Sequence, residues 1–381
     1  MVVAGEPSGD AHAAALVREL RQAEPETDFE FFGSTGTQMR AAGVDPVVCA
    51  DDLAILGIVE VGRALPKFWR AFRQLKRAAI EREPDAVILV DWPEFNLRLA
   101  RALHRRGLKI VYYISPQVWA WRSYRVRNIR RDVDLLLSIM PFEKEWFASR
   151  DVSHVEYVGH PLAGEVRAQY DRAEFCYRNN LDSAQPIIAL LPGSRHKELV
   201  RILPPMVGAA ELISRTQPEI QFVVVVAPNR DPDEARETVA AGRFNSRLDS
   251  LRIIHHETRQ ALAAADAAAI ASGTATLEAA LLGTPMVIVY KESLINWHTL
   301  GRLITAEHYG LVNLIAGRRV VTELMQSELN PDRLAEELLA LLDPDRRRSV
   351  RSALRDVTAR LGEGGASRRA AETILNFIKT T

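Results

Sequence analysis

The chain has 381 residues, of which 47% are apolar and 26% are charged, the balance of an ordinary folded protein. This length predicts two domains of usual size, and the composition excludes collagen-like, low-complexity and generally disordered chains. The 49 Lys and Arg residues balance the 49 Asp and Glu residues. The basic excess that is typical of nucleic-acid-binding proteins is therefore missing, and we expect no nucleic-acid partner.

The cysteines, the histidines and the hydropathy pattern indicate which cellular compartment and which cofactors to expect. Cys49 and Cys176 are far apart in the sequence, which excludes a disulfide framework and a CxxC metal site. The histidines form no set with metal-ligand spacing. No apolar run approaches the roughly 18–20 residues that cross a bilayer, and residues 1–5 lack the features of a signal peptide. We expect a cytoplasmic protein without a metal, whose membrane contact is peripheral.

Short apolar runs alternate with helical stretches along most of the chain. The runs are mostly fully apolar rather than alternating, as in parallel strands that are buried on both faces. This alternation predicts an α/β protein, and the strands are too many for one sheet of ordinary size. A domain boundary is expected near residues 160–185, and only helices are expected after residue 330. The predicted strands are 86–90, 109–114, 135–140, 155–158, 187–191, 221–227, 267–271 and 285–290.

The first glycine turn, AGEPSGD at residues 4–10, follows a short strand and opens a helix. Glycines at such a turn let a ligand approach the backbone, and a helix N-terminus favours negative charge. The turn has neither the GxGxxG pattern of a nicotinamide dehydrogenase nor the lysine of a P-loop. A plain tight turn is the alternative interpretation.

Two further motifs follow predicted strands of the first half. Asp91 opens the segment DWPEFN, at the strand end where open α/β sheets bind ligands. It can act as a base or bind a hydroxyl, or else cap the next helix. The segment SPQVWAWR at 115–122 precedes a row of arginines. Because the net charge is zero, a sugar-facing or lipid-facing loop is favoured over nucleic-acid binding, and an aromatic core plug is the alternative.

The second half has two comparable turns, LPGSRHKE at 191–198 and ASGTATLE at 271–278. Arg195 can pair bidentately with phosphate oxygens while turn amides donate to the same group. Small residues at the second turn expose amides to a pyrophosphate, and Glu278 can accept ribose hydroxyls. Together the two turns predict one nucleotide-diphosphate site, with helix capping by Ser272 or Thr274 as the alternative.

Residues 58–82 predict an amphipathic helix with seven basic and two acidic residues. Its aromatic and aliphatic side chains gather on one face, and most basic side chains lie opposite or beside them. This pattern suits an anionic bilayer surface. A helix packed on the core with a solvated basic face is the other interpretation.

These motifs, with LGIVEV at 56–61 and PFEK at 141–144, closely resemble the lipid-A-disaccharide synthase family from residue 3 to about residue 376. The string SPQVWAWR is the most specific, because related two-domain transferases share only the later glycine motifs. The resemblance implies the α/β fold of GT-B type, with two Rossmann-like domains whose parallel sheets face across a cleft. It also implies an acceptor and membrane-facing domain at 1–165, a UDP-sugar-binding domain at 166–345, and C-terminal helices at 346–381 that pack back on the first domain.

The resemblance further implies an inverting hexosyltransferase that needs no metal or other cofactor. Its substrates would be UDP-2,3-diacylglucosamine and 2,3-diacylglucosamine 1-phosphate (lipid X), and its products the β-1,6 lipid A disaccharide 1-phosphate and UDP. The enzyme would be peripheral on the cytoplasmic face of the inner membrane. Homo-oligomer formation is possible, and the sequence does not decide it. Another enzyme of this fold, such as a UDP-N-acetylglucosamine transferase or 2-epimerase, is one alternative. A non-catalytic nucleotide-regulated protein on the membrane surface is the other.

Residue roles follow from matching the motifs to this family. Asp91 is expected to be the general base on the acceptor 6-hydroxyl, and Arg195 to stabilise the leaving diphosphate. The residues expected to bind the UDP-sugar are Gly193, Ser194, Arg195, Glu198, Ser272, Gly273, Thr274, Ala275, Thr276, Glu278 and Asn313. The residues expected to bind the acceptor are Glu6, Ser8, Gly9, Trp119 and Arg122. The residues expected to face the membrane are Ile58, Val61, Leu65, Phe68, Trp69 and Phe72.

Overall fold

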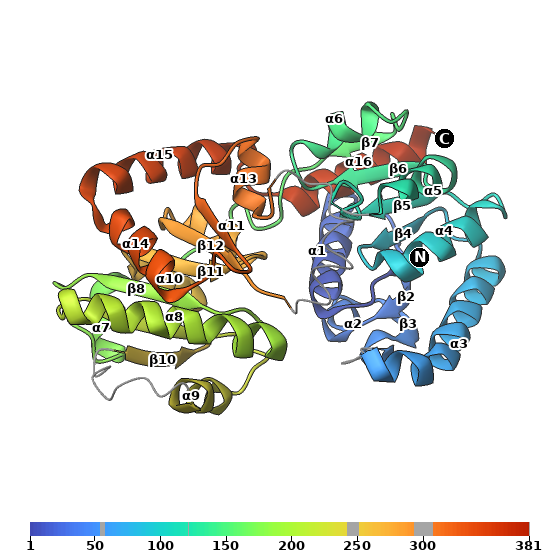
Figure 1. Cartoon of the computed structure of the whole chain (residues 1–381). Helices are drawn as coiled ribbons and strands as arrows, with labels where there is room; N and C mark the ends of the chain where they lie inside the picture. Colours follow the sequence, from blue (N-terminus) through green and yellow to red (C-terminus); the bar gives the residue numbers. More distant parts are fainter. Residues whose placement is uncertain (54–57, 121, 242–250, 293–307, 381) are drawn as a thin grey trace. The chain divides into compact units, whose positions relative to one another are not determined.

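Buried runs of aliphatic residues form two parallel sheets, one in each of two units (Figure 1). The computed structural model describes residues 1–53, 58–120, 122–241, 251–292 and 308–380, and of residues 52–53 and 58–65 it describes only the backbone. Unit 1 consists of Met1–Pro161 with Glu363–Thr381, and unit 2 consists of Leu162–Gly362. The expected α/β class with two Rossmann-like parallel sheets is confirmed.

The seven-stranded sheet of unit 1 has the order β3-β2-β1-β4-β5-β6-β7, and every pairing is parallel. Its side chains alternate between two cores. Val87 and Leu89 pack on the core shared with α3 and α4, whereas Ile88 and Val90 pack on the core shared with α1 and α16. The strands are β1 (Val2–Val3), β2 (Phe32–Thr35), β3 (Asp45–Cys49), β4 (Val87–Val90), β5 (Ile110–Tyr113), β6 (Leu135–Ser138) and β7 (Val155–Tyr157).

The sheet of unit 2 has the order β10-β9-β8-β11-β12-β13, again parallel throughout. Its central strands are fully buried, which explains their continuous apolar runs. The strands are β8 (Ile187–Leu191), β9 (Gln221–Val226), β10 (Leu251–His255), β11 (Ala267–Ala271), β12 (Met286–Tyr290) and β13 (Thr322–Met325).

Helices cover both faces of each sheet (Figure 1). In unit 1 they are α1 (Pro7–Ala23), α2 (Thr37–Ala41), α3 (Ile58–Arg82), α4 (Pro93–His104), α5 (Val126–Asp132), α6 (Glu143–Ala148) and α16 (Ala366–Thr380), with 3-10 turns at Ala50–Leu53 and Ser123–Arg125. In unit 2 they are α7 (Arg172–Arg178), α8 (His196–Thr216), α9 (Pro232–Ala241), α10 (Thr258–Ala264), α11 (Ala275–Leu281), α13 (Leu311–Ala316), α14 (Pro331–Leu342) and α15 (Pro344–Arg360).

The C-terminal helices are divided between the two units. From the sequence, the whole segment 346–381 is expected to pack on the first domain. Helix α15 stays in unit 2, because Arg347 pairs with Asp266 at 3.1 Å and Arg360 donates to the carbonyl of Ile315 at 2.8 Å. Helix α16 packs against α1 in unit 1, where Ile374 is fully buried. The divisions therefore fall at residues 161 and 362 rather than at 165 and 345.

The packing of α16 predicts a measurable contribution to the stability of unit 1. We expect Ile374→Ala to lower the free energy of unfolding of unit 1 by about 2–5 kcal/mol, because it leaves a cavity between α16 and α1. Urea unfolding followed by tryptophan fluorescence reports on this unit, since five of the six tryptophans belong to it. The control Lys379→Ala removes only an exposed pair with Glu24, which contributes about 1 kcal/mol or less. Equal stability of the two variants would contradict the role of α16.

Candidate functional site

Three turns lie at one edge of the unit 1 sheet. Strands β1, β4 and β5 are parallel neighbours, so their carboxyl ends share an edge. The glycine turn at 4–10 follows β1, Asp91 follows β4, and Ser115 comes shortly after β5. The topology therefore gathers three of the sequence motifs at the edge where parallel sheets bind ligands.

Asp91 has the electrostatic setting of a base. Its side chain is largely removed from water, and this burial together with the negative charge of Glu6 raises its pKa above the ordinary value of 3.8. The backbone N–H of Trp92 opposes the shift by hydrogen bonding to the carboxylate. A carboxylate with a raised pKa holds an abstracted proton better than an ordinary aspartate does.

The backbone at Asp91 is strained. Asp91 has a φ of 49° and Trp92 a φ of 50°, both in the left-handed region. For residues other than glycine this conformation costs roughly 1–2 kcal/mol each. The indole of Trp92 stacks on Phe95 with 4.2 Å between ring centroids. It also lies where a Cβ on Gly5 would be, so only glycine fits at position 5.

The other residues of the first glycine turn differ in exposure. Glu6 and Ser8 are exposed and free to meet a ligand. Gly9 is buried beside Ala4 and Val90, where it lets α1 pack closely on the sheet.

The motif at 115–122 is held by a buried carboxylate that sequence reasoning missed. Glu143, only 1% exposed, accepts hydrogen bonds from Ser115 Oγ at 2.7 Å and from Trp119 Nε1 at 2.9 Å. The N–H of Met140 donates to the same carboxylate at 3.2 Å. Burial raises the pKa of Glu143 to about 7 despite these donors. The only signal in the sequence was the segment PFEK, which contains Glu143.

Trp119, which is expected to bind the acceptor, is buried, its indole N–H is held by Glu143, and its ring packs edge-on against Phe142. This packing favours the alternative interpretation of the motif, an aromatic core plug. Arg122 keeps partial exposure and shares the carboxylate of Glu94 with Arg125, each at 2.5 Å. Arg122 thus remains a candidate for contact with an anionic group.

In unit 2, the turn after β8 is shaped by Glu198. Its Oε2 accepts the backbone N–H groups of Ser194 at 3.0 Å and Arg195 at 3.2 Å, as a capping box at the start of α8. Gly193 has a φ of 113°, and a Cβ there would collide with the Glu198 side chain. These two amides are thus occupied, unlike the expectation that the turn amides would hold a diphosphate. The side chain of Arg195 is 82% exposed, and its guanidinium contacts Glu198 at 3.1 Å.

The second turn of unit 2 lies at the carboxyl end of β11, the parallel neighbour of β8. Gly273 and Thr274 are exposed, and nothing lies near the position of a Cβ on Gly273. Glu278 lies one turn into α11 and accepts from Arg259 Nε at 2.9 Å. The remaining members bond locally, since Ser272 donates to the carbonyl of Tyr309 and Thr276 to that of Gly273. Ala275 begins α11 and is half-buried.

Asn313, expected to bind the UDP-sugar, lies inside unit 2 with its amide engaged in the fold. It is fully buried, and its Nδ2 donates to the carbonyl of Val321 at 2.9 Å and to Glu323 Oε1 at 2.7 Å. Its Oδ1 accepts from the N–H groups of Val320 and Val321. Every hydrogen-bonding group of the amide is therefore used inside unit 2, where it joins α13 to the chain entering β13.

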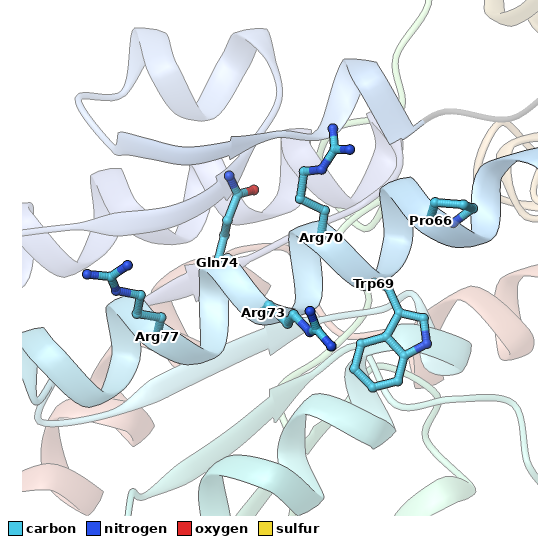
Figure 2. Close-up of a pocket in the computed structure, with 6 residues that line it drawn as sticks. All are labelled: Pro66, Trp69, Arg70, Arg73, Gln74 and Arg77. Atoms are coloured by element: carbon cyan, nitrogen blue, oxygen red, sulfur yellow. The ribbon is translucent and has the colours of Figure 1, made fainter.

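The residues of α3 divide between the core and the surface. Phe68 and Phe72 are half-buried and contact Phe95 of the core, so only part of each ring is left at the expected outward face. Trp69 is 60% exposed and has Arg73 over its ring at 5.3 Å. The side chains of Ile58, Val61 and Leu65 lie outside the described residues. A shallow pocket of about 540 Å³ along the exposed side of α3 is lined by Pro66, Trp69, Arg70, Arg73, Gln74 and Arg77 (Figure 2).

Clustered metal ligands and membrane-spanning helices are both absent from the described part of the chain. No group of three or more His, Cys, Asp or Glu side chains is placed there to hold a metal ion. None of its helices has both the length and the apolar character that crossing a bilayer requires.

Comparison with known proteins connects these turns to one family. The model of the family described as lipid-A-disaccharide synthetase matches residues 1–377. A lipid-A-disaccharide synthase of Solibacter usitatus (strain Ellin6076) is 44% identical over 383 residues, covering 100% of this chain and 97% of that protein. A lipid-A-disaccharide synthase of Myxococcus xanthus (strain DK1622) is 42% identical over 379 residues, covering 99% of this chain and 97% of that protein.

The fold is also found in more distant proteins of known structure. The UDP-GlcNAc 2-epimerase of Neisseria meningitidis, solved bound to UDP-GlcNAc, has a TM-score of 0.64 and 12% identity and covers 98% of both chains. This likeness concerns the fold alone and agrees with the expected GT-B type. The full-length family match does not favour the alternative functions considered above. The chain therefore belongs to the lipid-A-disaccharide synthase family, and it is a glycosyltransferase of lipid A biosynthesis.

Proposed function

We propose that Asp91 is the general base with which this enzyme joins UDP-2,3-diacylglucosamine to 2,3-diacylglucosamine 1-phosphate. The observation that carries this proposal is the half-buried carboxylate with a raised pKa at the ligand-binding edge of the unit 1 sheet. Asp91 takes the proton of the acceptor 6-hydroxyl as that oxygen bonds to the anomeric carbon of the donor sugar. The bond from that carbon to the diphosphate breaks, UDP leaves with the electron pair, and the configuration inverts.

Exposed polar groups near Asp91 are suited to the acceptor. Glu6 and Ser8 lie on the neighbouring turn and can accept or donate to sugar hydroxyls. Arg122 is held by Glu94 but keeps exposed surface toward an anion. We assign the acceptor phosphate to Arg122, because guanidinium groups bind phosphate oxygens in a bidentate geometry.

The donor is assigned to the two turns of unit 2. The exposed guanidinium of Arg195 would neutralise the diphosphate as charge develops on it, and the open turn at Gly273 and Thr274 would receive its other oxygens. Glu278 would accept the ribose hydroxyls. The role of Glu198 is to shape the first of these turns, and that of Asn313 is to join α13 to the chain entering β13. The solved epimerase of the same fold is bound to UDP-GlcNAc, which supports a UDP-sugar as donor.

The exposed side of α3 is assigned to the membrane. Trp69 presents an apolar ring with a polar N–H, the side chain that proteins place at a bilayer interface. Arg70 and Arg73 flank it in the same pocket and would attract anionic lipid headgroups (Figure 2). We propose that the enzyme binds peripherally to the cytoplasmic face of the inner membrane, where its acylated substrates reside.

Substitution of Asp91 tests the chemistry. We expect purified protein to release UDP from UDP-2,3-diacylglucosamine only when the acceptor is present, in detergent and with EDTA. Asp91→Asn should reduce this release by at least a hundredfold, because an amide cannot take the proton, while UDP affinity stays unchanged. The control Asp51→Asn changes an exposed aspartate of the same unit and should retain activity. Acceptor-dependent turnover by Asp91→Asn at the wild-type rate would remove Asp91 from the mechanism.

The influence of Glu6 on Asp91 predicts a shift in the pH profile. The base works only when ionised, so kcat/KM falls as the pH drops through the raised pKa of Asp91. Glu6→Gln removes a negative charge, which lowers this pKa and moves the acidic limb to lower pH. The control Glu145→Gln alters an exposed glutamate on α6 and should leave the limb in place. An unmoved limb in Glu6→Gln would contradict the electrostatic link.

The membrane assignment predicts weaker lipid binding after one substitution. Trp69→Glu should weaken sedimentation with vesicles that contain an anionic phospholipid, because it removes an interfacial ring and adds repulsive charge. Tyr177→Glu is the matched control, since Tyr177 is an exposed aromatic residue of unit 2. Equal vesicle binding by both variants and the wild type would return α3 to a purely structural role.

A further inference from the structure

The main-chain carbonyl of Asp91 accepts two hydrogen bonds from side chains of other elements. The hydroxyl of Tyr112, on β5, donates to it at 2.6 Å, and Nδ2 of Asn96, on α4, donates at 2.8 Å. The same Nδ2 lies 3.2 Å from the carbonyl of Val90, the preceding residue. The N–H of Asp91 donates to the carbonyl of Tyr113 at 3.0 Å. Both polar groups of the Asp91 backbone are therefore fixed from outside the turn.

These hydrogen bonds hold the backbone at the point where its conformation is strained. Asp91 and Trp92 are two consecutive residues with positive φ, a conformation from which an unrestrained chain would relax. Relaxation would rotate the peptide plane whose oxygen Tyr112 and Asn96 hold. Such a rotation also swings the Asp91 side chain away from its present direction.

The donors are not placed there by packing alone. Asn96 is fully buried, and its Oδ1 has no hydrogen-bond partner among the described residues. An unsatisfied buried acceptor is costly, so an apolar residue would suit this place better if only volume mattered. The hydrogen bonds that Nδ2 of Asn96 donates to the carbonyls of Asp91 and Val90 explain why an asparagine is found here. Tyr112 is fully buried as well, and burial raises its pKa well above the ordinary value, so its hydroxyl keeps its proton.

We infer that Tyr112 and Asn96 are positioning residues that hold the Asp91 carboxylate in the direction required for proton abstraction. This inference rests on the proposed role of Asp91 as the base. Neither side chain needs to touch a substrate, since each acts through the carbonyl of Asp91. Displacing a reacting group by about 1 Å can cost roughly a hundredfold in rate, so loss of one donor is expected to lower kcat.

Two neighbouring tyrosines allow a matched experiment. Tyr112→Phe removes a single hydroxyl and should lower kcat at least tenfold, with KM and the urea unfolding midpoint close to those of the wild type. Tyr113→Phe is the control, because Tyr113 is buried in the same strand but packs in the core of the opposite face. It should retain the wild-type kcat. A kcat for Tyr112→Phe within twofold of the wild type would overturn the inference.

A second substitution tests the shared acceptor. Asn96→Leu keeps the volume and removes the donor, and it should also lower kcat more than KM changes. If both donors act on one carbonyl, the double variant should lose less than the product of the two single losses. Independent, fully multiplicative losses would overturn the shared mechanism.

Asp91→Asn separates this inference from the proposed function. If Asp91→Asn is inactive while Tyr112→Phe is normal, only the positioning role fails. If Asp91→Asn keeps full turnover, the base assignment fails and the positioning role fails with it.

Discussion

Strands that are buried on both faces carry few polar side chains, and this constraint organises both units. Strands β4, β5, β8 and β11 are fully buried, and Tyr112 and Tyr113 carry their only polar side-chain groups, so most polar chemistry lies in the turns at their ends. A turn next to a buried strand also contains backbone groups that need partners. Single polar side chains supply these partners at several turns. Glu143 accepts the N–H of Met140 after β6, Glu198 accepts two N–H groups of the turn after β8, and Asn313 accepts two N–H groups of the chain entering β13.

The motifs therefore contain two kinds of residue with different duties. Some side chains fix the shape of a turn and are buried or fully bonded, as Trp119 and Asn313 are. Others are left exposed by that shape, as Ser8 and Arg195 are. A motif string is specific because both kinds must be present together. Exposure in the folded chain is what separates them, and the string alone does not reveal it.

The sequence was sufficient for the central strands and for the edge strand β7, but not for the other outer strands. Continuous apolar runs such as 187–191 and 267–271 match β8 and β11 in the structure. Strand β2 has the sequence FGST, and β3 contains a proline at the sheet edge, so neither shows an apolar run. Strands β10 and β13 lie at edges and carry charged residues. Their pairing comes from tertiary structure, which overrides weak local preference.

The roles of side chains were harder to predict, because they too depend on tertiary contacts. Helical periodicity placed Phe68, Trp69 and Phe72 on one broad face, but it could not tell which of them meet Phe95. At the other site, the position of Asp91 at the end of a strand was predictable. The positive φ at Asp91 and the donors from Tyr112 and Asn96 depend on neighbouring elements. They are contacts between distant residues, which local patterns do not encode.

The division of the C-terminal helices affects the order in which the chain can fold during synthesis. Unit 2 is continuous, so all its residues have been made by residue 362. Unit 1 begins first but needs α16, whose Ala370, Ala371 and Ile374 complete the core around α1. Until the ribosome has made this last helix, the apolar side of α1 lacks its cover. The unit whose synthesis begins first is thus completed after unit 2, and the apolar side of α1 stays exposed to solvent in the interval.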